Sequence, residues 1–358
     1  MNIHCTTVML VLLGWVSTVW AAPQCLEGDC VNGRGSIVND DGRRYTGQFK
    51  NGVIHGRGVL SFPDGSKYEG ELENGKMHGR GILTSGDGRR YEGRFRDDVI
   101  HGTGTLLQGD GTRYTGAFYQ GRYHGKGAIV FPDGRRYKGD FRNGIVHGRG
   151  RVTYPDGSWF EGVFKNGRPA GQGVRFYGDG SRYIGDYYGA ERHGQGKFTS
   201  RDGDVYEGMF RHDRYHGEGR HFYADGRVYD GQFVEGVKEG QGVLRYPDSS
   251  YYSGAFVNGT FDGEGEYVFA DGSTYQGEFR QGSFSGKGKL VYSDGSWYNG
   301  GFKNDLPHGF GIFHTADGDV YAGNFVRGRR EGKGRLTRAD GDIYWGTFEN
   351  DVFIEDQE

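Results

Sequence analysis

The chain has 358 residues, of which 71 are glycine and 54 are aromatic (25 Tyr, 24 Phe and 5 Trp), and its formal net charge is −3. Only 7 prolines accompany these glycines, which excludes a collagen triple helix, and an aromatic share of 15% excludes simple disorder. The 44 basic and 47 acidic residues are interleaved along the chain, so we expect no nucleic-acid partner.

The first 21 residues are predicted to form a secretory signal peptide. Residues 6–22 contain no charged side chain, and this apolar run has the length of a signal-peptide core. Small residues at the −3 and −1 positions favour cleavage after Ala21. Because no Lys or Arg precedes the run, an uncleaved anchor remains an alternative. In both cases we expect an exported chain that is periplasmic, envelope-associated or secreted.

Residues 22–44 form an N-terminal segment with a partial repeat and two cysteines. Cys25 and Cys30 are separated by four residues, and in an oxidising compartment they could close a small disulfide loop. A redox or metal pair is the weaker interpretation, because two cysteines without further nearby ligands make an incomplete zinc site.

Residues 45–350 repeat with a period of 23, and residues 351–358 form a C-terminal tail. An aromatic residue opens each of fourteen units, and it is Tyr in all of them except for Phe160. Gly follows two positions later in every unit, and Phe four positions later in all but those with Leu72 and Tyr187. Glycine pairs 11 and 13 positions after the aromatic residue, and Asp 19 positions after it, complete the pattern. A fixed period of this length indicates a repeat architecture.

Each unit is predicted to be a β-hairpin. The side chains of residues 44–50 (RYTGQFK) alternate between two faces, as in a strand. Asn51-Gly52 supplies a tight turn, and residues 56–62 form the return strand. Residues 62–65 (FPDG) then fit a type I turn. Tyr, Phe and Gly share one face, so we expect rings to lie over bare glycine backbone while the opposite, charged face is solvated.

Two roles for the aromatic face stay open. The rings could fill the grooves over glycine, or they could form a continuous exposed row that docks a partner, because a single sheet cannot cover both of its faces. The candidate interaction-face aromatics are Tyr68, Tyr91, Tyr114, Tyr137, Tyr206, Tyr229, Tyr275 and Tyr298.

Residues 68–81 (YEGELENGKMHGRG) closely resemble the consensus of the MORN repeat, and the resemblance covers nearly all of the chain after the leader. It implies an all-β fold, an elongated, twisted, single-layer antiparallel sheet of stacked hairpins. It also implies homodimerisation or protein partners, and membrane-phospholipid association has been proposed for the family.

No catalytic, metal or cofactor site is predicted. Histidines recur ten positions after the aromatic residue, but equivalent residues in adjacent hairpins lie about 10 Å apart, too far to share one zinc ion. The Asp-Gly turns suit turn formation better than calcium binding. The Gly-x-Gly pairs lack the third glycine and the helix of a phosphate loop.

We therefore expect a non-enzymatic, exported scaffold that binds a protein partner, possibly itself, through the aromatic–glycine face. Binding of an envelope glycan or of phospholipid headgroups is the alternative. With a net charge of −3 and, as we interpret the sequence, no strong basic stripe, an anionic lipid surface is the less favoured partner.

Overall fold

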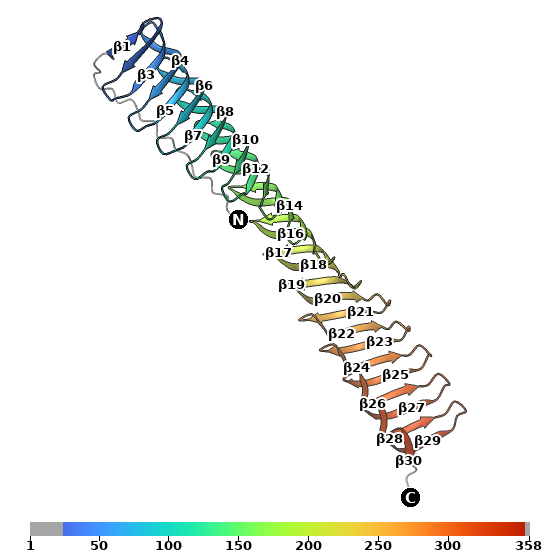
Figure 1. Ribbon diagram of the computed structural model, residues 1–358. Coiled ribbons are helices and arrows are strands. Elements are labelled where there is room, and N and C mark those ends of the chain that lie inside the picture. Colours follow the sequence, from blue (N-terminus) through green and yellow to red (C-terminus); the bar gives the residue numbers. More distant parts are fainter. Residues whose placement is uncertain (1–23, 355–358) are drawn as a thin grey trace. The chain divides into compact units, whose positions relative to one another are not determined.

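The computed structural model describes residues 24–354, and its described residues form thirty strands and no helix. These strands, which Figure 1 labels along the chain, fall into two compact units that divide between Ala190 and Glu191. In both units each strand pairs antiparallel with its neighbour along the chain, as the pairings of β9 with β10 and of β17 with β18 illustrate. The predicted all-β fold of stacked antiparallel hairpins is confirmed.

Unit 1 contains β1 (Gln24–Gly28), β2 (Arg34–Val38), β3 (Arg44–Lys50), β4 (Val53–Ser61), β5 (Lys67–Glu73), β6 (Lys76–Thr84), β7 (Arg90–Arg96), β8 (Val99–Leu107), β9 (Arg113–Tyr119), β10 (Arg122–Val130), β11 (Arg136–Arg142), β12 (Ile145–Thr153), β13 (Trp159–Lys165), β14 (Arg168–Phe176) and β15 (Arg182–Tyr188).

Unit 2 contains β16 (Glu191–Thr199), β17 (Val205–Arg211), β18 (Arg214–Phe222), β19 (Val228–Val234), β20 (Val237–Arg245), β21 (Tyr251–Val257), β22 (Thr260–Val268), β23 (Thr274–Arg280), β24 (Ser283–Val291), β25 (Trp297–Lys303), β26 (Leu306–His314), β27 (Val320–Val326), β28 (Arg329–Thr337), β29 (Ile343–Glu349) and β30 (Val352–Ile354).

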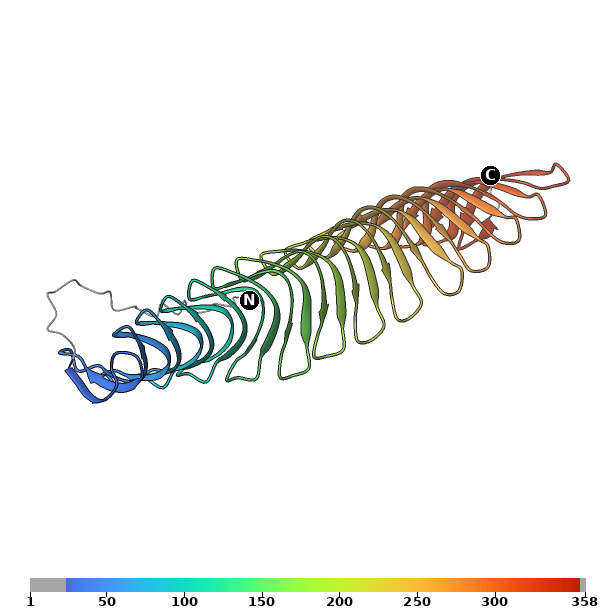
Figure 2. The ribbon, with the colours of Figure 1, turned by 90° about the horizontal axis from the view of Figure 1, so that it is seen from above.

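The hairpin of β9 and β10 illustrates the repeating geometry. Its turn residues Gln120 and Gly121 have φ values of 49° and 72°, the two positive values of a type I′ turn. The first strand has seven residues and the second has nine, so the register shifts between Tyr123 and Gly127. Gly125 lies in this bulge with a φ of 61°, a conformation that favours glycine. The strands of each unit are correspondingly curved (Figure 2).

The loop between hairpins is as compact as the sequence predicts. Gly134 donates its backbone N–H to the carbonyl of Phe131 at 3.0 Å, and Phe131 donates to the carbonyl of Arg135 at 2.9 Å. The Oδ1 atom of Asp133 accepts the backbone N–H of Arg135 at 3.0 Å, which fixes the turn locally. The recurrent Asp-Gly pair is therefore explained by turn geometry.

The core of the hairpin of β9 and β10, like that of most repeats, is a tyrosine ring lying over two facing glycines. Gly116 and Gly127 are directly opposite each other, and a Cβ placed on Gly127 would lie 2.6 Å from Cε2 of Tyr114. The phenol of Tyr114 donates to the carbonyl of Ala117 at 2.6 Å, so its polar end is satisfied inside the hairpin. The predicted placement of rings over bare backbone is thus observed.

Candidate functional site

The eight tyrosines proposed above as an interaction face are buried. Each of them is at most 1% exposed, so they belong to the core and present no surface to a partner. The expectation of an exposed row is wrong, and the alternative, that the rings fill the grooves over glycine, describes this structure. The eight are Tyr68, Tyr91, Tyr114, Tyr137, Tyr206, Tyr229, Tyr275 and Tyr298.

Neighbouring side chains cover each ring from three directions. Tyr114 meets Phe118 of its own strand edge-on at 4.9 Å between centroids, and Phe141 of the next repeat at 5.2 Å. Tyr123, which is nine positions after Tyr114, stacks on it at 3.8 Å with an interplanar angle of 12°. A single sheet can bury its own aromatic face because its strands curve and consecutive repeats interlock.

Burial also suppresses ionisation of these phenols. Loss of hydration raises the pKa of Tyr45 to about 12, although its hydrogen bond to the carbonyl of Gln48 acts in the opposite direction. The same loss of hydration raises the pKa of Tyr252 to about 12. These tyrosines are therefore neutral packing groups at physiological pH.

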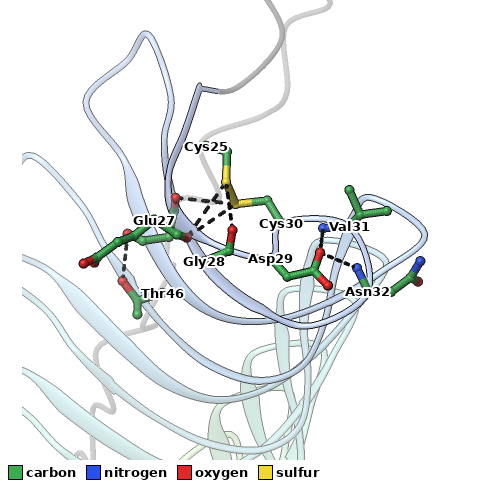
Figure 3. The surroundings of a disulfide bond; sticks show 9 residues. Cys25, Glu27, Gly28, Asp29, Cys30, Val31, Asn32 and Thr46 are labelled. Atoms are coloured by element: carbon green, nitrogen blue, oxygen red, sulfur yellow. Dashed lines mark hydrogen bonds between the residues drawn. A yellow bond between two sulfur atoms is a disulfide. The ribbon is translucent and has the colours of Figure 1, made fainter.

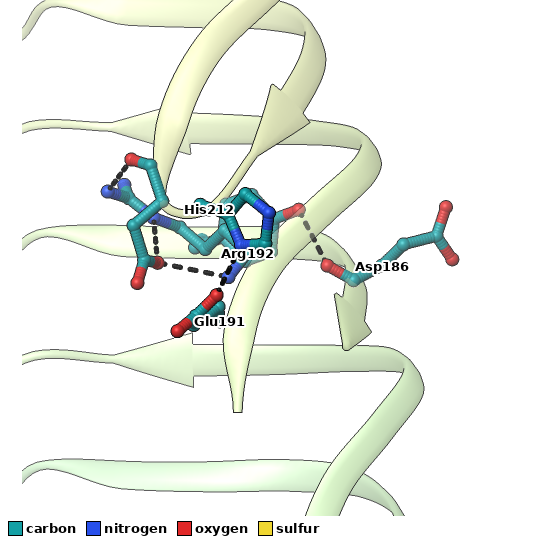
Figure 4. A network of polar contacts seen from close by, with 6 residues as sticks. Asp186, Glu191, Arg192 and His212 are labelled. Atoms are coloured by element: carbon teal, nitrogen blue, oxygen red, sulfur yellow. Dashed lines mark hydrogen bonds and ion pairs between the residues drawn. The ribbon is translucent and has the colours of Figure 1, made fainter. Parts of the chain in front are cut away.

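The residue nine positions after the tyrosine distinguishes three repeats of unit 2. In unit 1 this residue is uncharged, but in unit 2 it is Arg192, Lys238 or Arg330 in three repeats. The Arg192 guanidinium lies 5.3 Å from the Phe210 ring centroid, and its Nε lies 3.0 Å from Asp213 Oδ1. Figure 4 shows this region, where Glu191 also contacts His212 at 2.8 Å. Arg330 likewise contacts rings and the Asp351 carboxylate, whereas the Lys238 Nζ lies 5.3 Å from the ring centroids of Tyr223 and Tyr229. These contacts give the three cations a structural role.

The face opposite the tyrosines of unit 1 contains a hollow of about 1100 Å³. Residues from β2 to β9 line it, and glycines such as Gly81 and Gly104 form part of its floor. Its charged lining consists of six arginines and two glutamates, a net charge of +4. The charged residues are Arg34, Arg57, Arg80, Arg90, Arg94, Arg113, Glu69 and Glu92. We call this hollow the arginine groove.

Two of its arginines face each other across adjacent strands. Arg80 of β6 is directly opposite Arg94 of β7, an arrangement that like charges disfavour. Within residues 24–354 neither forms an ion pair, and the same holds for Arg34 and Arg113. The two glutamates do not neutralise them, because Glu92 pairs with Arg90 at 2.9 Å and Glu69 lies 3.5 Å from Lys67. The groove therefore has unbalanced positive charge.

The arginine groove continues into a basic column at the position before each tyrosine. In unit 1 this position is basic in every repeat except the one with Trp159. The basic members are Arg44, Lys67, Arg90, Arg113, Arg136 and Arg182, and all of them are exposed. In unit 2 the same position holds Val205, Val228, Tyr251, Thr274, Trp297, Val320 and Ile343.

This column corrects the expectation that the chain has no basic stripe. The net charge of −3 sums both units and hides a local concentration of cations in unit 1. The signal was present in the sequence, because the residue before the tyrosine is basic in all but one repeat of unit 1 and uncharged in unit 2. Comparing the residue before the tyrosine from one repeat to the next would have revealed the basic column.

Cys25 and Cys30 are joined by a disulfide, with their Cα atoms 6.1 Å apart (Figure 3). The bond closes the turn between β1 and β2, and the Asp29 carboxylate accepts the backbone N–H groups of Val31 and Asn32 in the same loop. These two hydrogen bonds lower the pKa of Asp29. A Cβ on Gly35 would lie 2.7 Å from Cys30 Sγ, so the disulfide occupies the space that a tyrosine ring takes in later repeats.

A second hollow, of about 410 Å³, lies on the tyrosine side of unit 2. Its charged lining is internally paired, because Arg338 contacts Asp319 at 2.9 Å and Arg330 contacts Asp351 at 3.3 Å. It therefore lacks the unbalanced charge of the arginine groove.

No group of three or more His, Cys, Asp or Glu side chains suited to a metal ion occurs in the described part of the chain. No helix long and apolar enough to cross a membrane occurs in residues 24–354 either. The predicted leader, its cleavage after Ala21 and its alternative as an anchor lie outside the described residues.

Comparison with known families finds thirteen consecutive matches to the model described as "MORN repeat". They cover residues 45–67, 68–89, 91–113, 114–135, 137–159, 160–182, 183–205, 206–226, 229–251, 252–274, 275–297, 298–320 and 321–343. No curated protein matches the chain.

Solved structures match at low identity. The SAS-4 TCP domain of Drosophila melanogaster, in complex with a proline-rich motif of Ana2, is 16% identical, with 56% of this chain and 90% of that chain covered and a TM-score of 0.23. A mutant TCP10 domain of Danio rerio CPAP is 15% identical, with 80% of this chain and 96% of that chain covered and a TM-score of 0.15.

Proposed function

The chain belongs to the MORN repeat family, and on that premise we propose that it is a non-enzymatic interaction scaffold whose arginine groove binds an extended acidic segment of a protein partner. MORN repeats are generally interaction or membrane-binding modules. The observation that carries the proposal is the facing pair Arg80 and Arg94, which lies in a hollow and forms no ion pair with a carboxylate of residues 24–354. An acidic ligand would relieve this repulsion.

The dimensions of the groove specify the ligand. Eight successive strands, β2 to β9, line it, and at about 4.8 Å per strand spacing they extend over about 34 Å. An extended chain of about ten residues covers this distance. Equivalent positions of adjacent hairpins are about 9.6 Å apart, which is the length of about three extended residues. In a polyproline II conformation, with three residues per turn and a rise of about 3.1 Å per residue, an acidic side chain at every third position lies on one face and would therefore meet successive arginines.

The concavity of the site favours a polypeptide segment over a membrane. A planar bilayer contacts the rim of a hollow, whereas a single extended chain can follow the hollow along its length and contact Arg80 and Arg94 of its lining. A phospholipid surface and an anionic envelope glycan share the charge of this ligand, and the experiment below separates them from it.

Fluorescence anisotropy of a labelled ten-residue peptide with Glu at every third position tests the proposal. We expect saturable binding that weakens with salt, and no binding of the peptide with Gln in place of Glu. The variant Arg80→Gln/Arg94→Gln should bind at least ten-fold more weakly. The control Lys287→Gln/Lys333→Gln removes the same charge from unit 2, from the position that Arg80 occupies in its repeat, and should bind as the unmodified chain does.

Other outcomes contradict the proposal. Equal weakening by both double variants would show a non-specific charge effect. Binding to phosphatidylserine vesicles or to cell-wall glycan, lost in Arg80→Gln/Arg94→Gln while the peptide fails to bind, would assign the groove to a lipid or a glycan.

We further propose that the scaffold acts outside the cytoplasm. The uncharged run of residues 6–22 and the disulfide between Cys25 and Cys30 support an oxidising compartment. Mass spectrometry of the exported chain should find an N-terminus at Ala22. Recovery of the chain in the cytoplasm with its first 21 residues intact would contradict export.

A further inference from the structure

The loops between hairpins carry aromatic rings of their own, 17 positions after the core tyrosine. In unit 2 this position is aromatic in four consecutive repeats, as Tyr223, Tyr246, Phe269 and Tyr292, and all four side chains are half-buried. We call these residues the loop rings. An exposed Asp follows each loop ring by two positions, so a ring and a carboxylate recur together along one edge of the sheet.

Two loops of the chain show what this combination holds. The guanidinium of Arg135 lies 4.9 Å from the ring centroid of Phe131, and its Nε donates to Oδ2 of Asp133 at 2.6 Å. In unit 2, Arg227 lies 4.8 Å from the centroid of Tyr223, and its Nε donates at 2.8 Å to Oδ2 of the carboxylate in its own loop. Each loop thus binds one guanidinium by a cation–π contact and a charge-assisted hydrogen bond.

The next three loops of unit 2 keep the ring and the carboxylate but lack the arginine, which Ser replaces at positions 250, 273 and 296. Ser250 donates its backbone N–H and its hydroxyl to Oδ1 of Asp248, at 2.9 and 2.6 Å. Ser296 donates in the same way to Oδ1 of Asp294, at 2.8 and 2.6 Å. Within residues 24–354, Oδ2 of Asp248 and of Asp294 has no hydrogen-bond or ion-pair partner. This is the oxygen that binds arginine in the two loops above.

The rings of these three loops are also free of cations. Tyr246, Phe269 and Tyr292 have no cation–π contact in the described part of the chain, whereas Arg175 lies 5.0 Å from the centroid of Tyr154, the equivalent ring of a repeat in unit 1. Near the start of unit 1 the row of rings is interrupted, because Ser and Gln occupy the position at residues 85 and 108. Three adjacent loops with a ring, a carboxylate and no arginine therefore distinguish unit 2.

The carboxylates give this edge a negative charge. The hydroxyl and backbone N–H of Ser250 lower the pKa of Asp248, and those of Ser296 lower the pKa of Asp294. Within residues 24–354 neither carboxylate forms an ion pair, and the same holds for Asp271. The surface is therefore complementary to a cationic ligand.

The spacing of the loops indicates the form of that ligand. Equivalent positions of adjacent repeats are about 9.6 Å apart, since each repeat contributes two strands. One turn of a polyproline II helix, which has three residues, advances about 9.3 Å. An arginine at every third residue of such a helix would therefore meet the three loops in succession.

We propose that the loops of Tyr246, Phe269 and Tyr292 bind an extended segment of a protein partner that has arginine at every third residue in a polyproline II conformation. Each guanidinium lies on a loop ring and donates to the carboxylate two positions later, as Arg135 and Arg227 do within the chain. The site lies in unit 2 and takes a basic ligand, so it is independent of the arginine groove and of its acidic ligand.

Fluorescence anisotropy of the intact chain with the labelled peptide RPPRPPR tests the proposal. We expect saturable binding that weakens with salt. The peptide RPPPRPPPR has the same three arginines at a spacing that does not match the loops, and it should bind at least ten-fold more weakly. Equal binding of the two peptides would show a non-specific attraction of cations and would overturn the proposal, as would the absence of binding.

Two double variants locate the site. Asp248→Asn/Asp294→Asn keeps the Oδ1 acceptors but removes the charge, and it should bind RPPRPPR at least ten-fold more weakly. The control Asp110→Asn/Asp317→Asn changes the same loop position in two repeats where Gln and Thr replace the ring, and it should bind as the unmodified chain does. Equal weakening by the two double variants would overturn the proposal.

A third variant fills the site from within the chain. Ser250→Arg/Ser296→Arg restores the arginine that loops such as that of Arg135 contain, so it should fold with an unchanged circular dichroism spectrum and bind RPPRPPR at least ten-fold more weakly. Full binding by this folded variant would overturn the proposal. Self-association of the unmodified chain that this variant abolishes, without any binding of the peptide, would assign the loops to a second copy instead.

Discussion

Tyr114 lies directly over Gly127, so closely that a Cβ on this glycine would be 2.6 Å from the ring. Replacing Gly127 with Ala should therefore force the ring or the strand to move and should lower the free energy of unfolding by about 1–3 kcal/mol. Chemical denaturation checks this value.

A matched control lies in the same hairpin. No atom lies within 4 Å of a Cβ on Gly121, whose φ is 72°. Gly121→Asn should cost less than 1 kcal/mol, because asparagine tolerates this backbone conformation. A Gly127→Ala variant as stable as Gly121→Asn would mean that the ring does not depend on bare backbone.

High pH should unfold the array through its buried tyrosines. Burial raises the pKa of Tyr252 from 10.0 to about 12, so its neutral form is favoured in the folded state. This stabilisation is fully present below pH 10 and is lost as the pH rises towards 12, by up to about 3 kcal/mol for one such tyrosine. The phenolate absorbance of the buried tyrosines, beyond that of exposed ones such as Tyr119 and Tyr188, should appear together with the loss of the β-sheet circular dichroism signal. A folded chain in which the buried tyrosines are ionised would contradict this account.

Tyr252→Phe provides a conservative version of the same test. It keeps the ring, as Phe160 does naturally, but removes the ionisable group and its hydrogen bond to the carbonyl of Ala255 at 2.8 Å. The variant should be about 1 kcal/mol less stable at pH 7 and less sensitive to pH between 10 and 12.

Reversing one charge in the arginine groove should separate stability from binding. Arg94→Glu places a carboxylate opposite Arg80 and should raise the free energy of unfolding by up to about 1 kcal/mol, since it replaces repulsion with attraction. The same change should abolish binding of the acidic peptide. A variant that loses stability while it keeps binding would show that Arg94 has a structural role.

Removal of the disulfide should act locally. Cys25→Ser/Cys30→Ser removes a constraint on a short loop, worth about 2 kcal/mol. Because contacts in repeat proteins are between neighbours, hydrogen exchange should accelerate in β1 and β2 and stay unchanged from β5 onwards. Faster exchange throughout unit 1 would contradict a local effect.

The sequence predicted the local geometry well because a single unit contains its causes. The period, the turn at Asn51-Gly52 and the rings over glycine all follow from residues within one hairpin. Burial of Tyr114 was not predictable in this way, since it depends on Phe141 of the next repeat and on strand curvature produced by the bulge at Gly125. Alternation assigns a residue to a face, but it does not say whether that face is covered.

The arginine groove was missed for a different reason. The net charge sums the charges of the whole chain, whereas the electrostatic potential at Arg80 and Arg94 is set by the few charged residues opposite and beside them. Their direct juxtaposition depends on the register between β6 and β7, and the sequence alone does not give that register across a loop.

The central claim is that the aromatic face is the core and that the face opposite it binds the partner. Photo-crosslinking with the acidic ten-residue peptide, carrying a benzophenone at its centre, tests this claim most directly. The account predicts crosslinks to the groove lining between residues 57 and 116, which are lost in Arg80→Gln/Arg94→Gln. Crosslinks concentrated in unit 2, or crosslinks in unit 1 that persist in that variant, would contradict it.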